Sequence, residues 1–188
     1  MRSTRFSLLI MALALSLGAI AQYHDDLGLK AGEPVPHAIA APDQTGKVRR
    51  FADLTGEKGA VLVFFRSANW CPYCQAQLTD LNARRGDIEA AGYRLVGISY
   101  DPVDHLAAFA EKEQIGFPLL SDDGSEIIKG FGILNTEVNE KSRTYGIPYP
   151  MLVVVSADGT IRAKLAEESY RDRPEIDVLL AALADLEA

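Results

Sequence analysis

Two predominantly apolar runs, the first of them uninterrupted, predict buried strands. They are residues 59–65 (GAVLVFF) and 93–100 (YRLVGISY), and both are rich in β-branched and aromatic residues. Between these runs the apolar positions change to helical spacing, which predicts a helix from Cys74 onward that Gly92 closes, directly or after a short extension. The positions that carry this helical pattern are Cys74, Leu78, Leu81 and Ile88.

The second half of the chain predicts a helix, a hairpin and a final helix. Asp101-Pro102 indicates a helix start with Asp101 as N-cap, followed by the apolar stripe Leu106, Phe109 and Ala110. Residues 151–165 read as two strands joined by a turn at Asp158-Gly159. Pro174 opens a last helix with Ile176, Leu179, Leu180 and Leu183 at helical spacing. This order predicts an α/β fold, with a central mixed sheet flanked by helices.

The first 21 residues have the pattern of a signal peptide. Arg2 and Arg5 precede the uncharged apolar run 8–20, which is shorter than the roughly 20 residues of a membrane span. Ala19-Ile20-Ala21 matches the small-x-small cleavage pattern, so Gln22 is expected to begin the mature protein. The alternative is an uncleaved membrane anchor. We therefore expect a protein that is exported to the periplasm and has no stable membrane anchor.

Size and charge limit the remaining possibilities. The chain has 188 residues and a net charge of −7, and removal of Arg2 and Arg5 makes it two units more negative. That excess argues against a nucleic-acid partner. We expect residues 22–31 to form a linker and residues 32–188 a single domain, large enough to fold without disulfides.

The only cysteines, Cys71 and Cys74, lie where a helix follows a buried strand. Pro72 suits a first helical position, and residues three apart share a helix face, so the two sulfurs are expected to meet. The positive end of a helix favours a thiolate, which makes Cys71 the expected nucleophile and Cys74 the resolving cysteine. Trp70 and Tyr73 are expected to shield the pair while leaving the Cys71 sulfur reachable.

A structural disulfide and a metal site are the alternatives for the pair. A disulfide between Cys71 and Cys74 closes a very small loop and constrains the unfolded chain little. Zinc requires about four ligands, whereas His24, His37 and His105 are scattered without ligand spacing. The redox interpretation is therefore favoured, and neither a metal nor another cofactor is predicted.

The stretch VLVFFRSANWCPYCQAQLTDLN resembles the alkyl hydroperoxide reductase/thiol-specific antioxidant (AhpC/TSA) redoxins of the thioredoxin-like superfamily. The likeness runs from about Gly32 to the C-terminus. It implies a thioredoxin-like fold with an N-terminal β-hairpin extension, formed by the stretch AGEPVPHAIAAPDQTGKVRRFADL. It also implies that Pro150, in GIPYPMLVVV, is the proline that faces the cysteines through a cis peptide bond; the alternative is an ordinary trans proline at a strand's first residue.

The chain departs from this family in several positions. Typical peroxiredoxins carry a proline seven residues, and a threonine three residues, before the peroxidatic cysteine; counted from Cys71, those positions are Phe64 and Ala68. Pro150 stands where these enzymes have a peroxide-binding arginine, and the sequence does not place Arg66 or Arg143 as a substitute. Phe65 stands where thioredoxins often bury an acid, so no general base for Cys74 is recognisable.

Three functions follow from this comparison. The first is an exported thiol–disulfide oxidoreductase that acts on protein or small-molecule disulfides with a thiol reductant or oxidant as partner. The second is a thiol-dependent peroxidase that acts on hydroperoxides. The third, a copper(I)-binding or redox-inert module, has the least support. Residues 167–175 (EESYRDRPE) receive no role and are expected to be a solvated lead-in to the last helix.

Overall fold

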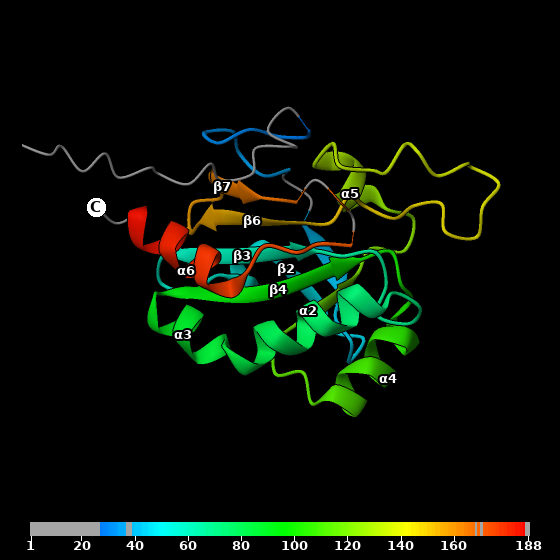
Figure 1. The fold of residues 1–188 in the computed structure, drawn as a ribbon, viewed down its shortest axis with the longest axis horizontal. Helices are drawn as coiled ribbons and strands as arrows, with labels where there is room; N and C mark the ends of the chain where they lie inside the picture. The colour runs from blue at the N-terminus through cyan, green and yellow to red at the C-terminus, as the bar shows by residue number, and fades with distance from the viewer. Residues whose placement is uncertain (1–26, 37–38, 168, 170, 187–188) are drawn as a thin grey trace, which may run out of the picture.

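The predicted buried strands lie side by side at the centre of a five-stranded sheet, as Figure 1 shows. The computed structural model describes residues 27–36, 39–167, 169 and 171–186. Strand β3 (Gly59–Phe64) pairs in parallel with β4 (Tyr93–Ser99) and antiparallel with β6 (Met151–Ser156). Strands β5 (Leu119–Ser121) and β7 (Ile161–Leu165) form the edges, giving the order β5-β4-β3-β6-β7. The predicted mixed sheet is confirmed.

A separate two-stranded hairpin precedes the sheet, in agreement with the predicted N-terminal extension. Strand β1 (Ala40–Pro42) pairs antiparallel with β2 (Val48–Arg50). The Asp43 carboxylate organises its turn by accepting hydrogen bonds from Thr45 N–H at 2.8 Å and Arg49 Nε at 2.7 Å. Asp43 also forms an isolated bridge with Leu120 of β5, which places the hairpin beside an edge of the main sheet.

Alternation along β3 divides the core into two clusters, one on each face of the sheet. Val61 and Val63 point into the first cluster, which also receives Cys71 and Cys74. Leu62 and the other side chains of the opposite parity point into the second cluster. Because every residue of β3 is buried, the uninterrupted apolar run has the burial pattern expected of a strand covered on both faces.

The helices cover both faces of the sheet. The first cluster lies under α2, α3, α4 and α6, and the second lies under α1, α5 and the hairpin. The bounds are α1 (Phe51–Leu54), α2 (Pro72–Ala83), α3 (Arg85–Ala90), α4 (Val103–Glu113), α5 (Glu126–Gly130) and α6 (Ile176–Asp185). The cysteines thus reach the same core cluster as the last helix of the chain.

Local details differ from the sequence-based prediction at three helix ends. The helix expected from Cys74 to Gly92 is broken at Arg84, whose backbone leaves the helical region (φ −103°, ψ 11°). Gly92 ends the second part, α3, with φ +91°. The N-cap of α4 is Pro102 and not Asp101, because the Asp101 side chain bonds to the preceding loop instead. Helix α6 begins two residues after Pro174.

The expected signal peptide, residues 1–21, lies outside the described residues. Of the expected linker, residues 27–31 are described, and they lie against the domain. Leu29 N–H donates to Phe131 O at 3.0 Å, and Lys164 Nζ donates to Leu27 O at 2.8 Å. Within the described part of the chain, no helix has the length and apolar character needed to cross a bilayer.

Candidate redox site

Cys71 and Cys74 form a disulfide at the N-terminus of α2, with their Cα atoms 5.3 Å apart. Cys71 is the N-cap, and its Sγ accepts a hydrogen bond from Cys74 N–H at 3.3 Å. Pro72 occupies the first helical position, where a missing N–H costs no hydrogen bond. The predicted placement of both cysteines in one helical turn is confirmed, and the helix terminus directs a backbone N–H and partial positive charge at the Cys71 sulfur.

A buried carboxylate fixes the loop that leads from β3 to the cysteines. Asp101 Oδ1 accepts a hydrogen bond from Ser67 Oγ at 2.7 Å, and Oδ2 accepts from Ala68 N–H at 2.6 Å. Ser99 Oγ donates to Oδ2 at 3.0 Å. Burial raises the pKa of Asp101 above its ordinary value, although these three donors oppose the shift. Asp101, which follows β4, therefore fixes the position of the loop that precedes Cys71.

Both sulfurs are enclosed in this disulfide form. Cys71 is 1% exposed and Cys74 is 0% exposed, so the expectation that the Cys71 sulfur remains reachable is wrong for the oxidised state. The reason is that both cysteines belong to the apolar core under α2, where Phe65 and Leu78 are also buried. Tyr73, in contrast, is 44% exposed.

Trp70 lies immediately before the pair and is held by two polar neighbours. Its Nε1 donates a hydrogen bond to Tyr100 Oη at 3.0 Å. The Arg66 guanidinium lies over the indole ring, 4.9 Å from the centroid, which is a cation–π contact. The structure thus places Arg66 beside Trp70, whereas Arg143 is exposed on the segment between α5 and β6.

Pro150 occupies the expected end of the sheet but not the expected conformation. It directly precedes Met151, which pairs with Phe64, the last residue of β3. Pro150 therefore lies at the end of the sheet where the cysteine-bearing loop leaves β3. None of the peptide bonds between described residues is cis, and the expected cis bond before Pro150 is therefore wrong. A trans proline suits this position because Pro150 stands just outside β6 and its missing N–H takes no bond from the sheet ladder.

Arg173 is the site residue that the sequence analysis missed. Its Nη2 lies 3.4 Å from Cys74 Sγ, although the two residues are 99 positions apart in the chain. Its Nη1 donates to Asp172 O at 2.6 Å. Burial, and secondly the nearby charge of Arg66, lower the pKa of Arg173 to about 10. The expectation that residues 167–175 are a solvated lead-in is thus wrong at Arg173, and no local pattern in the sequence signals this contact.

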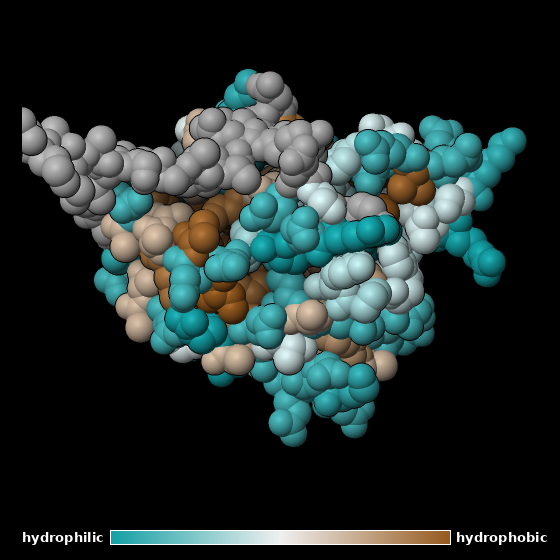
Figure 2. Space-filling view, viewed as in Figure 1, coloured by the Kyte–Doolittle hydropathy of each residue, from teal (hydrophilic) through white to brown (hydrophobic). Residues whose placement is uncertain are grey.

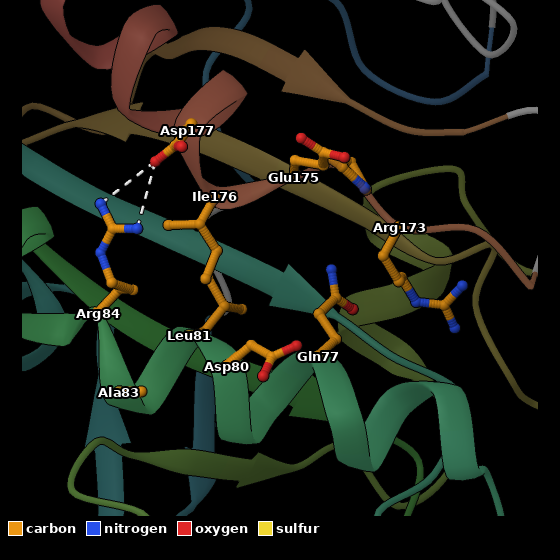
Figure 3. Close-up of a pocket in the computed structure, with 10 residues that line it drawn as sticks. Gln77, Asp80, Leu81, Ala83, Arg84, Arg173, Glu175, Ile176 and Asp177 are labelled. Carbon is orange, nitrogen blue, oxygen red and sulfur yellow. Dashed lines mark hydrogen bonds and ion pairs between the residues drawn. The ribbon is translucent and has the colours of Figure 1, made fainter.

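A groove of about 440 Å³ opens between α2 and the start of α6, and Arg173 is one of the residues that line it. Figure 3 shows Gln77 and Arg173 among the residues that line it, and an ion pair between Arg84 and Asp177. This pair, with an N–O distance of 3.2 Å, connects the C-cap residue of α2 to α6. Gln77 is 7% exposed, and its Oε1 has no hydrogen-bond partner among the described residues. Figure 2 shows an apolar area around α6 beside hydrophilic surface.

Metal-ligating groups do not gather in the described part of the chain. No three residues among its histidines, cysteines, aspartates and glutamates are placed to hold a metal ion. His105 lies on α4, while His24 and His37 are outside the described residues.

The fold and the cysteine pair together define a thioredoxin-like, thiol-based oxidoreductase. Within this class, residues 31–164 match the model of the AhpC/TSA family. The chain belongs to that family, as the resemblance of its cysteine-bearing segment implied.

Individual relatives and solved structures agree with this membership. The chain is 34% identical over 133 residues to peroxiredoxin Bcp of Escherichia coli, covering 71% of this chain and 83% of that protein. It is 30% identical over 148 residues to a putative peroxiredoxin Bcp of Haemophilus influenzae, covering 79% and 93%. The crystal structure of peroxidoxin BcpB from Mycobacterium tuberculosis superposes with a TM-score of 0.68 at 27% identity, covering 85% of this chain and 97% of that one.

Proposed function

We propose that this protein is a thiol-dependent peroxidase whose Cys71–Cys74 pair cycles between a dithiol and a disulfide. The observation that carries the proposal is the disulfide at the N-terminus of α2, in a chain whose relatives are named peroxiredoxins. The class of thiol oxidoreductase was expected from the sequence, with the peroxidase as the second choice. The comparisons favour the peroxidase over disulfide exchange as the main activity.

The proposed cycle uses each sulfur once. The Cys71 thiolate attacks the terminal oxygen of a hydroperoxide, the O–O bond breaks, and the departing alkoxide takes a proton to leave as an alcohol. Cys71 is then a sulfenic acid. The Cys74 sulfur attacks the Cys71 sulfur, the hydroxyl group leaves as water, and the disulfide forms. A thiol reductant returns two electrons and two protons to restore the dithiol.

The helix terminus supports the choice of Cys71 as the first nucleophile. In the disulfide form its Sγ already accepts the Cys74 N–H, a donor that would favour a thiolate in the reduced form. Because both sulfurs are enclosed when joined, peroxide is expected to reach Cys71 only after reduction separates them. We also propose that Trp70, Tyr73 and Pro150 border this site.

Single-turnover measurements test the peroxidase and the order of attack. Reduced wild-type protein should consume hydrogen peroxide or an organic hydroperoxide with a second-order rate constant well above that of free cysteine. Cys74→Ser should consume one equivalent and leave a sulfenic acid on Cys71 that dimedone labels, while Cys71→Ser should react slowly. A wild-type rate equal to that of free cysteine removes the proposal. Faster reaction of Cys71→Ser than of Cys74→Ser reverses the order of the two cysteines.

Thiol–disulfide exchange is the second candidate, and a specific observation favours it. Counted from Cys71, Phe64 and Ala68 replace the proline and threonine of typical peroxiredoxins, and both are buried apolar residues that offer a peroxide no side-chain hydrogen bond. In exchange, Cys71 would attack a partner disulfide and Cys74 would release the product. Reduction of a model protein disulfide at a rate that exceeds peroxide consumption would assign this activity. The reduction potential of the pair would then fix its direction.

We also propose export, with residues 1–21 as the cleaved signal. The support is the basic start, the apolar run and the small-residue cleavage pattern of the sequence. Expression of the full chain in a Gram-negative host, followed by fractionation and mass spectrometry, tests it. A soluble periplasmic protein beginning at Gln22 is expected; retention of Met1 in the cytoplasmic fraction would overturn it.

A further inference from the structure

The resolving step of the proposed cycle requires a nucleophilic sulfur on Cys74, and the helix terminus does not supply it. The Cys74 N–H points at Cys71, so the donor at the end of α2 serves the first cysteine. Phe65 stands at the position from which thioredoxins often act on the second cysteine, and it is fully buried. Another group must therefore favour the thiolate of Cys74 if the second step is to be fast.

Arg173 is the charged group that reaches this sulfur. The guanidinium Nη2 lies 3.4 Å from Cys74 Sγ, within hydrogen-bond reach of a sulfur acceptor. A charged donor strengthens when its acceptor becomes an anion, because the contact then combines a hydrogen bond with Coulomb attraction. The same contact to a disulfide sulfur, which carries no charge, is weak.

The surroundings of Arg173 favour this use of its charge. Pro174, the next residue, is buried, and Arg84 and Asp177 join α2 to the first turn of α6 on the same side. Burial lowers the pKa of Arg173 to about 10, with Arg66 adding to the shift, so the folded protein holds this cation at a cost. A thiolate on Cys74 would offset part of that cost, since each charge stabilises the other.

We propose that Arg173 is a catalytic residue that holds Cys74 as a thiolate in the reduced protein and so activates it for disulfide formation. The inference rests on the proposed function only where it names the step that is accelerated, the attack of Cys74 on the oxidised Cys71. Its core, the ionisation of Cys74, holds for a peroxidase and for an exchange enzyme alike. It also gives segment 167–175 a role that neither its sequence nor its place before α6 indicates.

Other charged groups border the same place and would also act on Cys74. Carboxylates that line this groove, or a second groove formed by α2 and described residues of segment 167–178, raise the pKa of a nearby thiol, and Arg66 and Arg171 lower it. These groups are Arg66, Asp80, Glu167, Arg171, Asp172 and Glu175. Comparing Arg173→Met with its parent cancels their contribution, because all of these groups are present in both proteins.

Titration of Cys74 as the sole thiol tests the proposal. In a Cys71→Ser background, thiolate absorbance at 240 nm and iodoacetamide alkylation are followed against pH. Adding Arg173→Met should raise the Cys74 pKa by about one unit or more, the effect of losing an opposite charge at this distance. Arg173→Lys should restore part of the shift. Arg171→Met, which removes the same charge two residues away, should move it much less.

The reverse background separates a local effect from general damage. With Cys74→Ser, the titration of Cys71 should change little on Arg173→Met, because the terminus of α2 stabilises that thiolate. Equal shifts on both cysteines would indicate a disturbed helix and overturn the specific contact. An unchanged Cys74 pKa after Arg173→Met would also overturn the proposal. Neither result depends on peroxide turnover, so a failure here is distinct from a failure of the proposed function.

Discussion

Asp101 shows how one buried carboxylate supports the site from behind. It binds Ser67 and Ala68 of the loop before Cys71 and Ser99 at the end of β4. The sequence suggested a helix cap because Asp before Pro is a common helix start, and only the fold reveals that the carboxylate turns toward the neighbouring loop. The cysteine loop is therefore fixed by a residue that follows a different strand.

Asp101→Asn is expected to change how stability depends on pH. Burial raises the pKa of Asp101 in the folded protein above the ordinary 3.8, so the folded state takes up a proton before the unfolded state does. The wild type should therefore gain free energy of unfolding relative to Asp101→Asn as the pH falls from neutrality toward 3.8. The gain should be complete below 3.8 and lost as the pH rises through the folded pKa.

Urea unfolding of both proteins between pH 7 and pH 4 measures this difference. An asparagine still offers an oxygen to Ala68 N–H, which makes it a matched variant, whereas Asp101→Ala should lose about 1–3 kcal/mol at all pH values through unpaired buried donors. Parallel pH curves for the wild type and Asp101→Asn would contradict the raised pKa.

Arg173 marks the limit of sequence reasoning at the residue scale. The placement of the cysteines was predictable because a Cys-x-x-Cys pair at a strand-to-helix junction is a local sequence pattern, and that pattern favoured the redox interpretation over a structural disulfide or a metal site. Arg173 has no such pattern, and its contact with Cys74 forms only when the end of the chain returns to α2. Resemblance placed Pro150 at the correct end of the sheet, but it favoured a cis peptide bond there, and the trans bond given as the alternative is the one the structure has.

At the scale of elements, the Gln44 side chain extends the hairpin turn onto edge strand β5. Its Nε2 donates to Phe117 O at 3.1 Å, and its Oε1 accepts from Leu119 N–H at 2.8 Å. These are the bonds that a further strand would make, so the side chain covers part of an otherwise open sheet edge.

Gln44→Ala is expected to weaken this edge. The change leaves the Leu119 N–H and the Phe117 carbonyl without their side-chain partner, which should cost about 1–3 kcal/mol in urea unfolding. Hydrogen exchange at Leu119 N–H should accelerate. Gln44→Glu keeps the acceptor and should retain most of that protection while losing the bond to Phe117. Unchanged exchange at Leu119 in Gln44→Ala would show that the side chain contributes nothing to the edge.

Long elements were predictable and short ones were not. The strands β3, β4 and β6 show in the sequence because burial on both faces makes their runs predominantly apolar, with Arg94 of β4 as the one exposed side chain among them. Helices α1 and α5 have four and five residues, too few to display a helical period. The break at Arg84 also left no signal, because Ile88 resumes the apolar face of the preceding helix after the interruption.

At the scale of the whole molecule, the redox state of the cysteines is coupled to stability. The disulfide closes a loop of only four residues, so its effect on the entropy of the unfolded chain is about 2 kcal/mol at most. The reduced protein has its own source of stability, because the α2 terminus and Arg173 stabilise cysteine thiolates in the folded state. In the unfolded chain these thiolates are only sparsely populated near neutral pH.

The advantage of the oxidised form should therefore shrink as the pH rises. Thiolates that form in the folded protein below the ordinary cysteine pKa of roughly 8.5 add stability to the reduced state, and the gain increases from the folded pKa up to that value. Unfolding of oxidised and reduced protein by urea at pH 6 and pH 8 measures the change. In Arg173→Met the difference in unfolding free energy between oxidised and reduced protein should narrow less, because the contact to Cys74 is gone. Arg171→Met should follow the wild type. A gap that is constant with pH in all three proteins would mean that the folded structure stabilises neither thiolate, which would remove the electrostatic basis of the whole site.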